Sequence, residues 1–169
     1  ERLAESTWIA GGRHFVELPM REWPDRAALE QELADWEAKS AAANEAGDLL
    51  AARDARAYAE RARRWLARLD DMPEGDSFAM QFSVHKLGDA FWITCGGEPY
   101  NILQVELRRR FPNNPILISP VAGDLQIAYL LPEDSYGLGL YQEEPSILDK
   151  GCLEGLIEAI SEQVEAMID

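Results

Sequence analysis

The chain has 169 residues, with 31 acidic and 16 basic side chains and a formal net charge of −15. A hydrophobic content of 47% excludes wholesale disorder, and no apolar run approaches the roughly 18 residues of a membrane-spanning helix. Phosphate binding needs clustered Lys and Arg, so the acidic balance argues against nucleic acid and anionic lipid as partners. The length predicts a single domain or a domain fragment over residues 1–169. The first residues are polar and show no apolar core of a signal peptide. Because the chain begins without Met, we expect a processed or excised piece.

The first part of the chain predicts a helical hairpin. Residues 1–24 lack a sustained period and indicate an extended arm with one short strand over 14–18. Asp25 is a good N-cap, and apolar residues at helical spacing follow it as far as Gly47. A second helix is expected over 48–69, with an apolar stripe that includes Tyr58 and Trp65. The short Gly-containing link predicts an antiparallel hairpin over 25–70. Its arginines alternate with acids, which favours a salt-bridged exposed face over an anion site.

The second part, over 78–169, changes to a strand period and predicts an α+β layer. Phe78, Met80, Phe82 and Val84 alternate with smaller or polar residues, as in a half-buried strand. The expected elements are strands over 78–85 and 90–95, a helix over 100–110, strands over 116–118 and 125–131, a long irregular loop over 132–150, and a final helix over 151–168. This order favours the α+β fold class, with a mixed β-sheet packed by helices.

Few residues stand out as chemical candidates. Glu98 follows Gly96-Gly97 at the expected start of a helix, where free N–H groups would hold a carboxylate as an acid, a base or a metal ligand. The simpler interpretation is that Glu98 caps its own helix. Tyr129 lies in an apolar strand, where core packing is the default. The remaining candidates are expected to be structural: His14 and His85 as packed or exposed histidines, and Cys95 and Cys152 as buried free thiols, with a single bridge between the two cysteines left open.

A family resemblance adds to these interpretations. The segment from Leu87 to Pro99 (LGDAFWITCGGEP) resembles the strand–Gly–Glu segment of the neutral, or alkaline non-lysosomal, ceramidases. Residues 122–132, with Tyr129, resemble their Tyr-containing strand, and the loop with Tyr141-Gln142-Glu143 and Ser146 is also similar. The resemblance covers about residues 78–150. It is nearest to distant bacterial relatives and to the later part of the catalytic domain.

The resemblance implies half of a zinc site. In that family a zinc ion activates water to cleave the amide of ceramide, and its ligands are two histidines, a Glu and a Tyr. Glu98 matches the Glu and Tyr129 the Tyr, while neither histidine of this chain matches a family ligand. The resemblance thus implies zinc held together with upstream histidines of the same polypeptide, a lipid-like N-acyl substrate, a cleft loop that includes Tyr136 and Tyr141, and an extracytoplasmic location.

Two alternatives remain open. A divergent relative could keep the fold without the metal, as a packing or protein-interaction domain in which the hairpin over 25–70 is the interaction element. The acidic second half could bind a cation such as Ca²⁺, although no loop has the usual calcium-binding spacing. Neither the oligomeric state nor the substrate follows from the residues.

Overall fold

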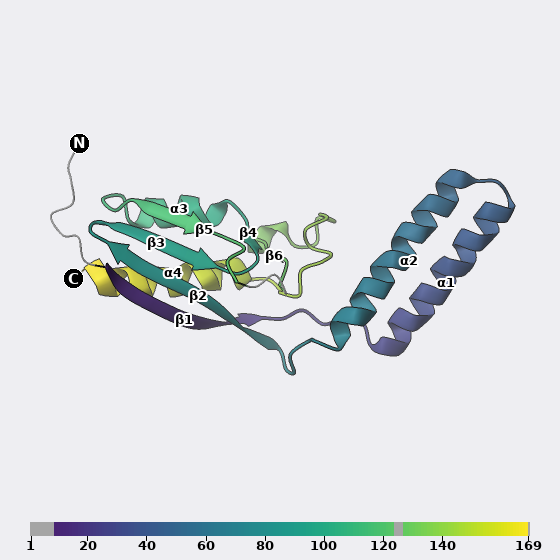
Figure 1. The fold of residues 1–169 in the computed structure, drawn as a ribbon, viewed down its shortest axis with the longest axis horizontal. Helices are drawn as coiled ribbons and strands as arrows, with labels where there is room; N and C mark the ends of the chain where they lie inside the picture. The colour runs from purple at the N-terminus through teal and green to yellow at the C-terminus, as the bar shows by residue number, and fades with distance from the viewer. Residues whose placement is uncertain (1–8, 124–126, 169) are drawn as a thin grey trace. The chain divides into compact units, whose positions relative to one another are not determined.

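The computed structural model describes residues 9–123 and 127–168, which form two compact units. One unit runs from Glu22 to Gly75, and the other combines the chain up to Arg21 with the chain from Asp76 onward. Figure 1 shows the first unit as a pair of helices and the second as a sheet with helices against it. In the described ranges, no helix combines the length and apolar character needed to span a bilayer.

The helical hairpin is confirmed. It consists of α1 (Arg26–Glu45) and α2 (Leu49–Leu69). The Asp25 carboxylate accepts a bond from the Ala28 N–H (2.7 Å), and the Asp48 carboxylate accepts one from the Ala51 N–H (3.0 Å). Each cap satisfies a backbone donor that the first helical turn leaves unpaired.

The hairpin core agrees with the expected apolar stripe at Ala62 and differs from it at the aromatic residues. Its buried side chains are those of Leu29, Ala52, Ala55, Ala59 and Ala62. Tyr58, expected in the core, is 43% exposed. Small side chains let two helices approach closely, so the larger side chains of α2 move to the edge of the contact.

The second unit is built on a mixed four-stranded sheet. The strands are β1 (Ile9–Pro19), β2 (Ser77–Leu87), β3 (Ala90–Cys95) and β5 (Ile116–Ser119), in the order β1-β2-β3-β5. The β1–β2 and β2–β3 pairs are antiparallel, and the β3–β5 pair is parallel. Together with the helices that pack on it, this sheet confirms the predicted α+β class with a mixed sheet.

Strand β1 is longer than the short strand predicted over 14–18. It pairs with β2 along its whole length, from Ile9 with Leu87 to Pro19 with Ser77. Gly11 permits this continuous pairing: its φ is +143°, and a Cβ there would lie 2.1 Å from the Val84 carbonyl oxygen. Glycine tolerates both the backbone angle and the close approach. The partner strand, which lies about 70 residues further along the chain, therefore decides the length of β1.

Two helices pack on the sheet unit. Helix α4 (Cys152–Ile168) contacts β1 and β2, and α3 (Ile102–Arg110) contacts β5 and α4. Figure 1 draws both on the far side of the sheet. The core lies between the sheet and these helices. It is formed by buried side chains of the strands and of α4, including Phe82, Phe91, Ile93, Leu156 and Ile160. Trp92 and Leu117, neighbours on β3 and β5, are instead 43% and 51% exposed.

The expected helical start at Glu98 is wrong. Glu98 and Pro99 form a two-residue strand, β4 (Glu98–Pro99), which pairs in parallel with β6 (Tyr129–Leu130), and α3 begins only at Ile102. Of the strand predicted over 125–131, residues 125 and 126 lie outside the described residues. The following loop is irregular, as predicted, apart from one 3₁₀ turn, η1 (Glu133–Ser135).

Candidate functional site

The small β4–β6 sheet brings Glu98 and Tyr129 side by side. The two residues are direct partners in the parallel ladder. The Glu98 N–H donates to the Ala128 carbonyl (2.6 Å), and the Tyr100 N–H donates to the Leu130 carbonyl (3.0 Å). Two residues 31 positions apart are thus held together by backbone hydrogen bonds, although the helix start expected at Glu98 does not exist.

Gly97 makes this pairing possible. Its φ is +61°, and a Cβ there would lie 2.6 Å from Cγ1 of Ile127 and 2.8 Å from the Ala128 carbonyl oxygen. The chain opposite is also in a left-handed conformation, with φ of +55° at Ala128. Left-handed geometry is costly for residues other than glycine, so the close approach of the two strands depends on Gly97.

Tyr129 lies between a carboxylate and other phenols. Its ring meets the ring of Tyr141 edge to face, with centroids 6.3 Å apart. Partial burial raises the pKa of the Tyr129 phenol, and the Glu98 carboxylate raises it further, as do Tyr141 and Tyr100. The neighbouring negative charge disfavours the phenolate. Without a cation at this place, Tyr129 therefore stays a neutral phenol at neutral pH.

Ser146, one of the loop residues quoted for the resemblance, holds the backbone of Tyr129. Its fully buried hydroxyl donates to the Tyr129 carbonyl (2.7 Å) and accepts a bond from the Leu148 N–H (3.2 Å). A buried hydroxyl with both partners in place fixes the two segments that it joins. The loop that follows β6 is thus tied to the strand that carries Tyr129.

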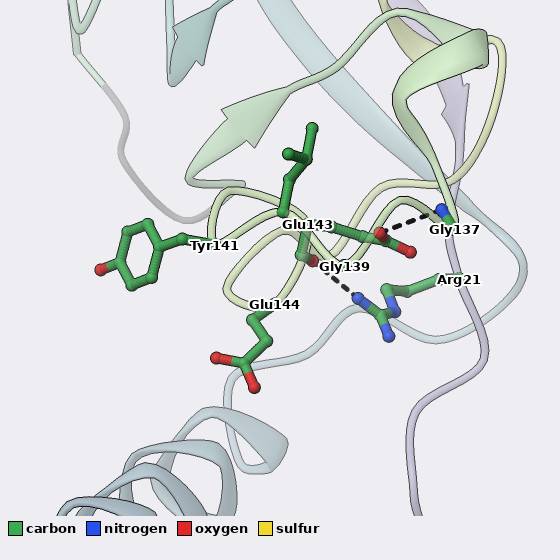
Figure 2. A pocket seen from close by; sticks show the side chains of 7 residues that line it. Arg21, Gly137, Gly139, Tyr141, Glu143 and Glu144 are labelled. Atoms are coloured by element: carbon green, nitrogen blue, oxygen red, sulfur yellow. Dashed lines mark hydrogen bonds between the residues drawn. The ribbon is translucent and has the colours of Figure 1, made fainter.

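A surface cavity of about 610 Å³ lies beside this loop (Figure 2). It is lined by Arg21, Gly137, Gly139, Leu140, Tyr141, Glu143 and Glu144. Arg21 donates through Nη1 to the Glu143 carbonyl (2.7 Å), and the Glu143 carboxylate accepts a bond from the Gly137 N–H (3.0 Å). Figure 2 shows the Tyr141 ring pointing away from Arg21. Tyr141 both lines the cavity and contacts Tyr129, so it connects the cavity with the Glu98–Tyr129 pair.

Tyr136, the second residue expected in a cleft loop, is not among the residues that line this cavity. Its hydroxyl lies within hydrogen-bond distance of the Leu148 carbonyl (3.2 Å) and of Cys152 Sγ (3.3 Å). Burial raises the pKa of this phenol, and its contact with Cys152 raises it further. In the structure Tyr136 therefore connects the loop to the first turn of α4.

The histidines and cysteines belong to the core sheet and its helix. His14 stacks on Phe82, with ring centroids 5.4 Å apart, and His85 lies beside Trp92. Both cysteines are buried and unbridged, as expected, and burial raises the pKa of the Cys95 thiol to about 12. Over residues 9–123 and 127–168, no three His, Cys, Asp or Glu side chains gather closely enough to hold a metal ion.

The sequence singled out Glu98, Tyr129 and Tyr141, which the structure brings together, but it did not single out Arg21. No motif surrounds Arg21; only the pairing of the end of β1 with the loop near Leu148 brings it to the cavity. Comparison of the chain with models of known protein families, with curated proteins and with solved structures gives no match.

Proposed function

We propose that this chain is the C-terminal part of a ceramidase-like, zinc-dependent amide hydrolase domain. The observation that supports the proposal best is the pairing of Glu98 with Tyr129 across β4 and β6. These are the two residues that match the family's Glu and Tyr ligands. Because they are 31 positions apart in the sequence, nothing local requires them to be neighbours in the folded chain.

The donor chemistry of the pair fits half of a zinc shell. A carboxylate and a phenol supply two oxygen ligands, and Glu98 is exposed, so it can reach a cation without paying a burial penalty. Two histidines from a preceding segment of the same polypeptide would complete the shell. When bound, zinc would supply a water molecule of lowered pKa for attack on the amide. Glu98 and Tyr129 would hold the cation, and the Tyr141 ring lies edge-on against the Tyr129 ring.

The face of the main sheet opposite α3 and α4 supports the proposal that a further segment of the polypeptide covers it. Trp92 and Leu117 lie side by side on this face, and Phe15 on β1 is 67% exposed. Exposed apolar side chains that gather on one face are typical of a contact surface. We infer that the preceding segment of the polypeptide packs on this face and thereby brings its histidines to the unit.

The cavity beside Tyr141 supports an N-acyl lipid as substrate. Its lining combines the apolar Leu140 and the Tyr141 ring with the charged side chains of Arg21 and Glu144. An amide that joins an apolar chain to a polar head group needs both kinds of surface. In this proposal the loop 132–150 shapes the substrate cleft, and Arg21 braces the loop from the end of β1.

Metal analysis of the polypeptide that includes the preceding segment tests the proposal. We expect about one zinc per chain in the unsubstituted protein, a large loss of zinc in Glu98→Gln and Tyr129→Phe, and no loss in the control Glu165→Gln, which changes an exposed carboxylate on α4. The isolated 169-residue chain should retain little zinc. If Glu98→Gln kept its full zinc content, Glu98 would be no ligand, and a non-catalytic packing or protein-interaction domain would be the better interpretation.

A further inference from the structure

The carbonyl groups of residues 128–131 are all hydrogen-bonded, and they alternate between two kinds of partner. The Ala128 and Leu130 carbonyls accept bonds from backbone N–H groups of the chain around β4. The Tyr129 and Leu131 carbonyls accept bonds from side chains instead. In the part of the chain that the structure describes, β6 pairs with β4 alone, so no strand lies on its other edge. Side chains therefore take the place there of a neighbouring strand.

The two side chains that donate on this other edge are those of Ser146 and Cys152. The Ser146 hydroxyl donates to the Tyr129 carbonyl (2.7 Å), and the Cys152 thiol, a weaker donor, bonds to the Leu131 carbonyl (3.7 Å). Both donors are fully buried, and so is Leu131. A buried carbonyl without a hydrogen bond costs free energy, so each donor stabilises the backbone of β6 in this position.

Tyr136 joins the two donors into one network, which we call the β6 clamp (Ser146, Tyr136 and Cys152). The Ser146 hydroxyl accepts a bond from the Leu148 N–H (3.2 Å), and the Tyr136 hydroxyl donates to the Leu148 carbonyl (3.2 Å). The same Tyr136 hydroxyl lies 3.3 Å from Cys152 Sγ. The network thus begins and ends on β6, at the two carbonyls that do not bond to the chain around β4.

The β6 clamp holds Tyr129 from the side opposite Glu98. Glu98 is the ladder partner of Tyr129, and its N–H donates to the Ala128 carbonyl (2.6 Å). The backbone of Tyr129 is therefore held on one edge by β4 and on the other by Ser146. Because a ladder of two residues offers few backbone hydrogen bonds, the bonds on the second edge decide how firmly the pair is held.

We propose that Ser146 and Cys152 are positioning residues for Tyr129, and that Tyr136 holds both donors in place. Their side chains replace a further strand on the outer edge of β6 and so keep the Tyr129 phenol beside the Glu98 carboxylate. The use of this arrangement in chemistry rests on the proposed zinc site, whereas the positioning is a property of the metal-free chain. Loss of one donor should loosen the β4–β6 ladder while the main sheet stays intact.

Amide hydrogen exchange, followed by NMR on the whole 169-residue chain without metal, tests the proposal. The reporters are the N–H groups of Glu98 and Tyr100, which donate across the β4–β6 ladder. The reference is the N–H of Phe91 on β3, which donates to the Pro115 carbonyl (2.8 Å). Local opening and global unfolding contribute separately to exchange, so the ratio of reporter to reference rates isolates the ladder.

Ser146→Ala removes one donor of the β6 clamp, and Ser161→Ala is its matched control. Ser161 is also a buried serine, and its hydroxyl donates to the Ile157 carbonyl (2.8 Å), but it lies nine residues beyond Cys152 on α4. We expect Ser146→Ala to speed the exchange of both reporters at least tenfold relative to the reference. Ser161→Ala should leave both ratios unchanged, and circular dichroism should show the same helix content in the two variants.

Cys152 supplies a second variant and a rescue. In Cys152→Ala the Leu131 carbonyl loses its donor, so the Tyr100 amide, which bonds to the adjacent Leu130 carbonyl, should exchange at least fivefold faster relative to the reference. Cys152→Ser puts a hydroxyl donor in place of the thiol and should return the ratio to within about twofold of the unsubstituted chain. If Ser146→Ala did not fold, this pair of variants would decide the test.

Three results would overturn the proposal. If the reporters in Ser146→Ala followed the reference, Ser146 would hold only the loop. If Ser161→Ala sped the reporters equally, the loss of any buried hydroxyl would suffice. If Cys152→Ser exchanged as fast as Cys152→Ala, the donor to the Leu131 carbonyl would have no role in the ladder. A longer polypeptide without zinc would remove the proposed function, but it would leave these results on the metal-free chain unchanged.

Discussion

Gly97→Ala is the substitution that most directly tests the geometry of the Glu98–Tyr129 pair. An alanine at φ of +61° costs about 1–2 kcal/mol, because its Cβ crowds the backbone in the left-handed region. Its Cβ would also lie under 3 Å from two atoms of Ile127 and from the Ala128 carbonyl oxygen. Relieving such an overlap in a packed region adds about 1–3 kcal/mol. The sum predicts a loss of about 2–5 kcal/mol in the free energy of unfolding.

Gly139→Ala separates the two contributions. Gly139 has a similar φ of +70°, but nothing lies within 4 Å of the position that its Cβ would take. This control should lose only the backbone contribution, about 1–2 kcal/mol. For a chain of this size each kcal/mol lowers Tm by about 2–4 °C. Thermal unfolding monitored by circular dichroism should therefore place Gly97→Ala clearly below Gly139→Ala.

The pKa of Tyr129 gives a second, local measurement of the effect of Gly97→Ala. If the overlap forces β4 away from β6, the Tyr129 phenol moves away from Glu98 and its raised pKa falls toward the ordinary value. Equal losses of stability in Gly97→Ala and Gly139→Ala would refute the reasoning, because they would mean that the approach of β4 to β6 is not tight at Gly97.

Three further predictions concern ionisation. The pKa of Glu106 is lowered to about 2 by a hydrogen bond from Arg109 and by a second one from Arg110. Because that pKa is depressed on folding, Glu106 contributes stability that is present above its unfolded pKa of about 4.5 and is lost as the pH falls through about 2. In Glu106→Gln, denaturant midpoints measured from neutral to acid pH should fall less steeply than in the parent, and parallel curves would contradict this. Glu98→Gln should lower the pKa of Tyr129, measured by ultraviolet difference absorbance with Tyr129→Phe to assign the signal; an unchanged titration would show that the carboxylate does not act on the phenol. The Cys95 thiol, with a pKa of about 12, should react with a thiolate-selective reagent only on unfolding, and rapid labelling of the native protein would argue against its burial.

Much of the local structure follows from the residues alone. Asp25 and Asp48 mark the starts of the two hairpin helices, because their short carboxylates reach free backbone N–H groups. The alternation from Phe78 to Val84 predicts β2, and the apolar stripe after Gly151 predicts α4. In each case the signal lies within about twenty residues, where helix and strand periods differ plainly.

The tertiary structure decided the features that depend on distant partners. Pro99 suits the first turn of a helix, yet the backbone on either side of it donates to the Ala128 and Leu130 carbonyls, so Glu98 belongs to a strand. Backbone pairing across 31 residues outweighs a local preference because it gives the N–H groups of Glu98 and Tyr100 carbonyl partners, whereas the first N–H groups of a helix have none within the helix. The same holds for β1, which extends because β2 offers it eleven paired positions.

The candidate site divides in the same way. The residue types at Glu98, Tyr129 and Tyr141 could be singled out in the sequence, because their neighbouring motifs are local. Only the folded chain shows how these residues are connected. Glu98 and Tyr129 are ladder partners, Tyr136 bonds to the start of α4, and Arg21 braces the loop of Tyr141. Local signals in the sequence predict which residues lie in each strand and loop. The pairing of strands far apart in the sequence decides which of their side chains come into contact.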